Sequence, residues 1–165
     1  MINKYLVLII IVALIIIFGF IDNLVKEPEI FPYQKRKYFL TPTEKMFFEV
    51  LLQIINNQYF IFPQIPMSSV IEVASGYHWR TYFNKIIRKS FDFVIFDKQN
   101  LNVLLVIELD DRSHERPDRI KRDRFVNESL KVVGLEILHI KPQQNYNTQE
   151  LSQQIFTKLA PKPNI

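Results

Sequence analysis

Two apolar segments that carry carboxylates constrain the fold of this chain more than any other feature. Residues 91–96 read FDFVIF, and residues 103–111 read VLLVIELDD after a short polar segment. Residues 103–107 show no polar alternation, which predicts a central strand covered on both faces. The polar segment 97–102 predicts a turn that joins the two segments as neighbouring strands. The pair therefore predicts the centre of a sheet in an α/β domain.

Three acids lie on these strands, where an ordinary core has none. Glu108 and Asp110 are two residues apart, so on a strand their side chains point to the same face. Asp92 lies on the preceding strand, where pairing brings it within several ångströms of them. Asp92 alone is typical of a strand-start residue, and Asp110 alone of a turn, but Glu108 ends an apolar run and is costly to desolvate without a partner. Together they predict a catalytic site that holds Mg²⁺ or Mn²⁺ through oxygen ligands and attacks a phosphodiester.

An uninterrupted apolar run occupies residues 5–21. As a helix at about 1.5 Å per residue it spans roughly 26 Å, near the lower limit for a bilayer. No small-residue cleavage site follows, which favours an uncleaved anchor over the alternative, a secretory signal peptide. Lys26 and the basic triplet 35–37 then predict a single-pass protein of the inner (cytoplasmic) membrane, with its C-terminal domain in the cytoplasm. The absence of cysteine agrees with that compartment.

The remaining pattern divides the chain into a transmembrane anchor (1–22), a linker (23–40) and a folded domain (41–160). Thr41, followed by Pro42 and by Glu44 three residues on, predicts a capping box and a helix to about residue 57. Residues 59–65 and 136–140 predict strands, and residues 78–89, 118–133 and 148–159 predict helices. The whole predicts a mixed sheet of four or five strands with helices on both sides.

Residues 78–89 (HWRTYFNKIIRK) predict an amphipathic helix. Its apolar face predicts that Tyr82, Phe83, Ile86 and Ile87 point inward. Trp79 is expected to be half-buried in the core, in preference to the alternative of a stacking surface for bases.

A basic segment, RSHERPDRIKRDR, occupies residues 112–124. Such a run is usually a solvated helix face, but beside a carboxylate site it predicts a grip on phosphates. The predicted nucleic-acid-binding residues are Arg88, Lys89, Arg112, Arg116 and Lys121. His114 is either an exposed loop histidine or a catalytic general acid, base or phosphate contact. A net charge of +4 and a pI near 9.2 permit a polyanionic partner such as DNA.

At these residues the chain resembles a bacterial domain family of unknown function, DUF2726, within the PD-(D/E)-x-K nuclease superfamily of restriction-endonuclease-like fold. The resemblance covers about residues 37–141. Its carriers are residues 40–44 (LTPTE), 91–94 (FDFV), 107–114 (IELDDRSH), 123–125 (DRF) and 134–135 (GL). The strand-end string is also similar to that of the very-short-patch-repair endonucleases.

This resemblance implies a magnesium-dependent phosphodiesterase site in which Asp92 and Glu108 hold the metal. The superfamily's usual lysine, two residues after the second acid, is Asp110 here, and the patch-repair-like relatives also lack it. His114 and Lys121 are candidates for the missing positive group. The expected function is a membrane-anchored nuclease acting on DNA. The alternative is a catalytically inactive nucleic-acid-binding or membrane-associated interaction domain of the same fold.

Overall fold

Two units make up the chain in the computed structural model, residues Met1–Lys37 and Tyr38–Ile165. The structure describes residues 3–24, 30–76, 78–110 and 117–160. Each unit is treated by itself below.

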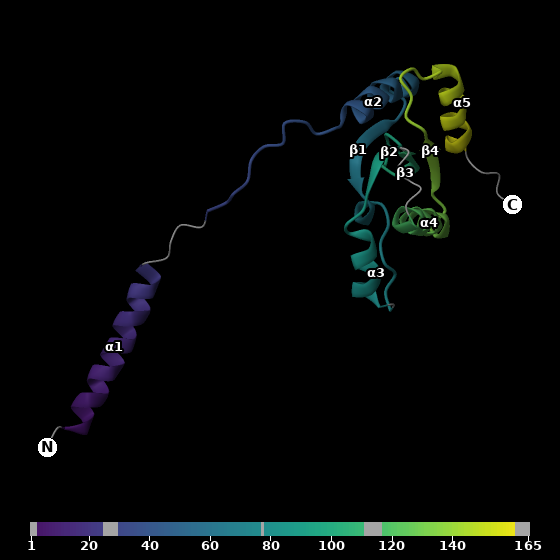
Figure 1. The fold of residues 1–165 in the computed structure, drawn as a ribbon. Helices are drawn as coiled ribbons and strands as arrows, with labels where there is room; N and C mark the ends of the chain where they lie inside the picture. The colour runs from purple at the N-terminus through teal and green to yellow at the C-terminus, as the bar shows by residue number, and fades with distance from the viewer. Residues whose placement is uncertain (1–2, 25–29, 77, 111–116, 161–165) are drawn as a thin grey trace. The chain divides into compact units, whose positions relative to one another are not determined.

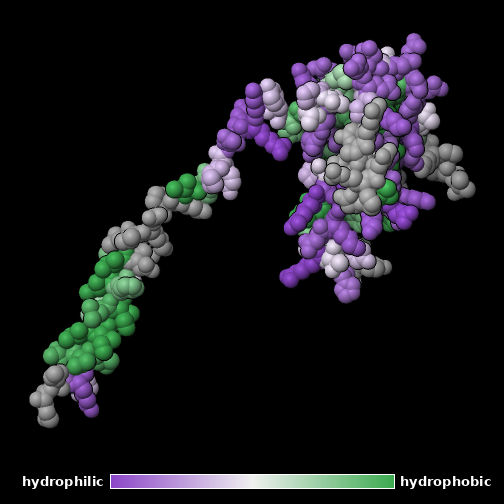
Figure 2. Space-filling view, in the orientation of Figure 1, coloured by the Kyte–Doolittle hydropathy of each residue, from purple (hydrophilic) through white to green (hydrophobic). Residues whose placement is uncertain are grey.

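The first unit contains one helix, α1 (Lys4–Leu24). At about 1.5 Å per residue its 21 residues extend roughly 32 Å, close to the thickness of a bilayer hydrocarbon core. Figure 2 shows apolar side chains along this helix, and none of the segment Lys4–Ile21 is buried in protein. By length and composition α1 therefore fits a membrane span or a signal sequence.

The second unit is a mixed α/β domain with a four-stranded sheet of order β1-β2-β3-β4 (Figure 1). Its elements are α2 (Pro42–Ile55), β1 (Phe60–Pro66), a 3-10 turn η1 (Met67–Ser69), α3 (Trp79–Ile86), β2 (Ser90–Phe96), β3 (Val103–Leu109), α4 (Pro117–Val132), β4 (Glu136–Ile140) and α5 (Thr148–Leu159). The predicted strands and helices are all present, with end points shifted by a few residues at most. The sheet has four strands, the lower of the two numbers expected.

The register of the sheet follows from its connections. The strands β1, β2 and β3 are joined as antiparallel neighbours, whereas β4 pairs with β3 in parallel after the crossover through α4. Asp97 closes the β2–β3 turn, because its carboxylate accepts the N–H groups of Gln99, Asn100 and Asn102. This turn fixes the pairing that brings the acids of β2 and β3 together.

A hydrophobic cluster lies on each face of the sheet. On one face α2 and α5 pack on Phe93, Leu105 and Ile107. On the other face α4, α3 and η1 pack on Val94 and Val106. The central strand β3 is thus covered on both sides, as its unbroken apolar sequence predicts.

The capping box at the start of α2 is confirmed. Thr41 Oγ1 accepts the Glu44 N–H at 3.2 Å, and Glu44 Oε2 accepts the Thr41 N–H at 2.7 Å. The other oxygen of Glu44 accepts the side-chain amide of Gln64, on β1, at 2.7 Å. Gln64 itself has a left-handed backbone (φ 55°) within the edge strand and follows Pro63.

The inward face predicted for residues 78–89 is only partly correct. Ile86 is buried and Phe83 packs against the second cluster, but Tyr82 and Ile87 are 43% and 47% exposed. Trp79 is 50% exposed and stacks on Phe83, with 4.4 Å between ring centroids. Among these side chains only Phe83 and Ile86 reach the core, so the expectation of a half-buried core tryptophan is wrong.

Candidate functional site

The sheet register brings polar side chains from three strands into one row. The antiparallel pair Phe93↔Ile107 continues to Asp92 and Glu108 as the next opposed residues. Across the parallel ladder, Glu108 pairs with His139. Side chains of opposed residues lie on the same face, so this row stands at one end of the sheet. It is the face on which α4 packs.

The sheet register places Asp92 beside Glu108, and each acid shifts the pKa of the other. The Leu109 N–H donates to Asp92 Oδ2 at 2.8 Å. Two neighbouring carboxylates repel one another, so the folded protein favours the protonated form of at least one of them.

Burial and mutual repulsion determine which acid holds that proton. Burial raises the pKa of Glu108 to about 8, and the charges of Asp92 and Asp110 act in the same direction. Burial also raises the pKa of Asp92, but the Leu109 N–H and the hydrogen bond from Glu108 oppose that rise. At neutral pH Glu108 therefore holds a proton. A divalent cation would displace the proton and neutralise both groups.

Arg122, on α4, supplies the positive charge beside this pair. It lies four residues before the buried Val126 on the same side of the helix, and its own side chain is exposed. Its guanidinium opposes the rise in the pKa of both Asp92 and Glu108. It also lowers the pKa of Lys89, for which burial is the larger cause. Arg122 and Lys89 thus form a cationic edge next to the acids.

The Lys89 ammonium is held in place at this edge. Its Nζ donates to the Lys85 carbonyl and lies 4.9 Å from the centre of the Phe125 ring. Of the other predicted nucleic-acid-binding residues, Arg88 and Lys121 are exposed. Arg112 and Arg116 lie outside the described residues, as does the catalytic candidate His114.

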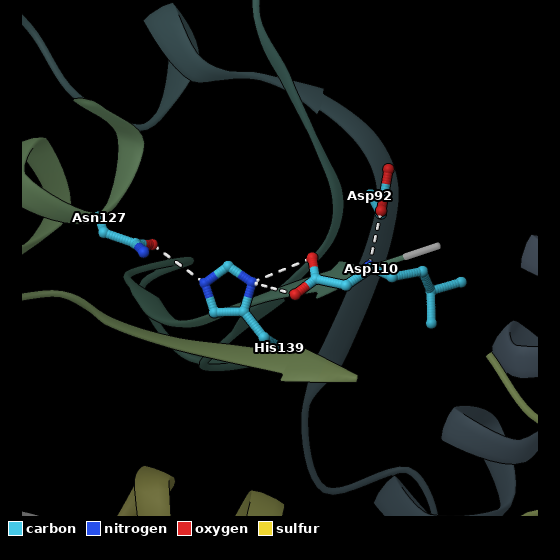
Figure 3. Close-up of polar contacts among 5 residues, drawn as sticks. Asp92, Asp110, Asn127 and His139 are labelled. Atoms are coloured by element: carbon cyan, nitrogen blue, oxygen red, sulfur yellow. Dashed lines mark hydrogen bonds and ion pairs between the residues drawn. The ribbon is translucent and has the colours of Figure 1, made fainter. Parts of the chain in front are cut away.

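Asp110 has a different partner from the other two acids. Its oxygens lie 3.1 and 3.0 Å from Nδ1 of His139, whose Nε2 lies 3.0 Å from Oδ1 of Asn127 on α4. Figure 3 shows the imidazole between Asp110 and Asn127, with Asp92 on the strand beside them. An aspartate that engages one ring nitrogen fixes the tautomer and the orientation of the ring. Asp110 therefore lies on the expected face but positions an imidazole.

A cavity of about 430 Å³ opens beside Asp92. Its lining residues are Thr41, Thr43, Glu44, Asp92, Leu109 and Pro142. The charge of Glu44 contributes to the raised pKa of Asp92. Glu44, at the capped start of α2, thus adds a further carboxylate beside the site. Its role in the capping box is sufficient to explain why the residue is there.

The donor set fits a hard divalent cation. Within the described ranges, no group of three or more His, Cys, Asp or Glu side chains is placed to hold a metal. Mg²⁺ does not require one, because it keeps several waters and commonly takes one or two carboxylates plus substrate phosphates. Asp92 and Glu108 supply two such carboxylates, and the raised pKa of Glu108 reflects in part the repulsion that a cation would relieve.

Sequence reasoning missed three of the residues at this site. In the sequence, Arg122 is one of many basic residues, although its spacing from Val126 places it on the same side of the helix as that buried residue. His139 occupied an otherwise apolar predicted strand, and that interruption was its signal. Asn127 had no signal, because its role depends on the packing of α4 beside β4.

Comparison with known proteins places the second unit in a family. A family model described as "Protein of unknown function (DUF2726)" matches residues 36–159, which include the whole sheet and its helices. No curated protein matches the chain. No solved structure matches it either.

Proposed function

The chain belongs to the DUF2726 family, and we propose that its second unit is a divalent-metal-dependent nuclease of restriction-endonuclease-like fold that hydrolyses DNA phosphodiester bonds. The observation that carries the proposal is the Asp92–Glu108 pair, in which burial and repulsion raise the pKa of Glu108 to about 8. A strongly perturbed acid beside a specific charge partner is typical of functional sites. The cavity that Asp92 lines provides access to it.

Asp92 and Glu108 would hold Mg²⁺ or Mn²⁺, whose charge, when the ion is bound, neutralises the phosphate and activates water for in-line attack. Glu108 must release its proton for this. The Leu109 N–H keeps Asp92 oriented during that change.

The cationic edge would bind the substrate. The guanidinium of Arg122 can donate two parallel hydrogen bonds to a phosphate, and the Lys89 ammonium adds a point charge beside it. This edge supplies the positive charge that Asp110 cannot provide at the superfamily's lysine position. His139, oriented by Asp110, lies next to Glu108 and can exchange a proton with a water at the site.

We propose that α1 anchors this domain in the inner membrane, with the domain in the cytoplasm. The support is the length and apolarity of the helix, together with the basic residues that follow it in the sequence. DNA attached to or passing near the membrane is the substrate that such a location favours.

A second candidate is a catalytically inactive nucleic-acid-binding or membrane-associated interaction domain of the same fold. The observation that favours it is the pairing of Asp110 with His139. Asp110 lies next to the proposed metal ligands Asp92 and Glu108, and in this pairing it serves a contact within the protein. Such a domain would retain the basic surface without turning over a substrate.

Cleavage of plasmid DNA by the full-length protein in detergent separates the two candidates. The nuclease proposal expects cleavage with Mg²⁺ or Mn²⁺, none with EDTA, and loss of cleavage in Asp92→Asn and in Glu108→Gln. Glu49→Gln, on the exposed surface of α2, is the matched control and should cleave as the wild type does. Cleavage that survives both site substitutions would contradict the proposed site. Salt-sensitive DNA binding without cleavage in any divalent metal would support the second candidate.

A further inference from the structure

The apolar face of α3 is only half covered by protein. The C-terminal half packs on the core through Phe83 and the buried Ile86. Tyr82 and Trp79, one and two turns before Ile86 on the same side, are 43% and 50% exposed, and Ile87 flanks them at 47%. Large apolar and aromatic side chains gathered in this way on a surface mark an interaction site.

The charged residues of the same segment are all cationic. Residues 78–89 contain Arg80, Lys85, Arg88 and Lys89 and no acid. Lys85 extends its Nζ over the Tyr82 ring at 4.7 Å from the centroid, so charge and aromatic surface adjoin. A helix that presents exposed Trp and Tyr beside Lys and Arg is typical of segments that lie in the membrane interface.

The exposed apolar surface continues beyond α3 to the end of α4. A groove of about 350 Å³ separates the two helices, and its lining includes Tyr82, Phe125, Val132 and Val133. Val132 is 85% exposed and Val133 is 48% exposed. These branched aliphatic side chains offer nothing to a phosphate or to a stacked base, whereas lipid chains accept them. The composition of the surface therefore favours a bilayer over a nucleic acid.

We propose that α3 and the adjoining rim of this groove, formed by Val132 and Val133, dock on the surface of an anionic phospholipid bilayer. The inference rests on the proposed membrane anchoring by α1. Trp79 and Tyr82 enter the headgroup region, and Arg80, Lys85 and Arg88 bind acidic lipid headgroups.

The covalent tether favours this docking. Residues 25–37 join α1 to the second unit, and a chain of about 13 residues spans at most ~45 Å. An anchored domain therefore meets the bilayer as an intramolecular event, at a high effective concentration. Weak individual contacts with lipid are then sufficient to keep one face of the domain bound to the bilayer.

Trp79 is the one tryptophan in the sequence, so its fluorescence reports directly on the proposed contact. The experiment uses the full-length protein in lipid nanodiscs of phosphatidylcholine, with or without phosphatidylglycerol, and with brominated acyl chains as the quencher. In the anionic discs we expect the fluorescence emission of Trp79 to shift to shorter wavelength and to be quenched at least about twofold more than in the neutral discs. About 1 M salt should remove this difference. Equal quenching in neutral and anionic discs, or none in either, would overturn the proposal.

Charge-reversal variants test the residues. Arg80→Glu/Lys85→Glu should abolish the lipid-dependent quenching, and Lys45→Glu/Lys98→Glu, an equal charge change on exposed lysines elsewhere, should not. Far-UV circular dichroism checks that both variants fold. An identical loss of quenching in both would contradict a specific role for α3.

The competing occupants give different results. Trp79 fluorescence that responds to a DNA duplex but not to lipid charge would indicate a nucleic-acid surface. A response that depends only on the number of chains per disc would indicate a second copy. Either result overturns the proposal. Failure of the protein to enter nanodiscs at all would refute the proposed membrane anchor. Incorporation without quenching of Trp79 would refute the docking of α3 alone. DNA cleavage is measured in a separate assay, so neither result decides the proposed nuclease function.

Discussion

Glu108 and His139 lie opposite one another in the parallel pairing of β3 and β4. Asp110, two residues after Glu108, contacts the Nδ1 of that histidine. The two acids on one strand face therefore have separate partners: Glu108 lies beside Asp92, and Asp110 contacts an imidazole. This division explains how an aspartate can stand next to a partly buried acidic pair without adding a third unpaired charge.

The pH dependence of stability should reveal the proton on Glu108. Because the pKa of Glu108 is raised in the folded protein from 4.5 to about 8, the folded state binds a proton that the unfolded state releases. The contribution of Glu108 to stability is then fully present below pH 4.5 and is lost as the pH rises to about 8, by at most about 1.4 kcal/mol per pH unit. Glu108→Gln should flatten this fall, as measured by thermal unfolding between pH 5 and pH 8 without divalent cations. Glu49→Gln should keep the wild-type slope, and equal slopes in all three proteins would refute the raised pKa of Glu108.

Arg122→Ala should lower metal-dependent DNA cleavage by about 10²-fold, the usual scale for removing one positioned electrostatic contact to a reacting group. The matched control is Arg124→Ala, since Arg124 is also an exposed arginine of α4 but lies two residues further along, on another side of the helix. Rates of plasmid nicking at saturating Mg²⁺ provide the measurement. Similar losses in both variants would mean that only general charge matters.

Asp110→Ala and His139→Ala should each reduce cleavage by about tenfold, because a group that orients another typically contributes 10- to 100-fold. If Asp110 acts through His139, the double variant should lose no more activity than either single variant. A double-mutant cycle on the cleavage rate makes this test. Multiplicative losses would show that the two residues act independently.

Val12→Arg/Ile15→Arg should release the protein from the membrane fraction, since each arginine in the middle of a span costs about 2.5–3.5 kcal/mol. Val12→Leu/Ile15→Leu is the control and should remain bound to membranes. Intact-mass measurement of the membrane-bound wild type distinguishes the two interpretations of α1. A protein that retains residues 1–24 has an anchor, and a shortened one has lost a signal sequence.

The sequence predicts the sheet well because its signals are local. The unbroken apolar run of β3 and the capping box at Thr41 each depend on a few adjacent residues. The convergence of Asp92 and Glu108 also follows from one short turn that sets the register. Metal binding and cleavage stay predictions.

What the sequence predicts poorly depends on long-range packing. The partnership of Asp110 with His139 requires the parallel pairing of β4, which no local pattern specifies. The positive group beside the acids was assigned to His114 or Lys121, whereas Arg122 is the residue whose charge acts on them. The exposed Tyr82 and Ile87 were predicted to be inward, because amphipathic spacing shows which side of a helix is apolar but not whether anything covers it.

The backbone of Gln64 has a consequence for the crowding of this protein in a membrane. Chains confined to a plane meet often, and a straight, unpaired edge strand recruits a neighbour's strand. On β1, Pro63 has no N–H to donate, and Gln64 turns the chain into the left-handed region between two ladder pairs. The outer rim of the sheet is thereby a poor template for edge-to-edge aggregation, so copies held in one leaflet by the proposed anchor would remain separate.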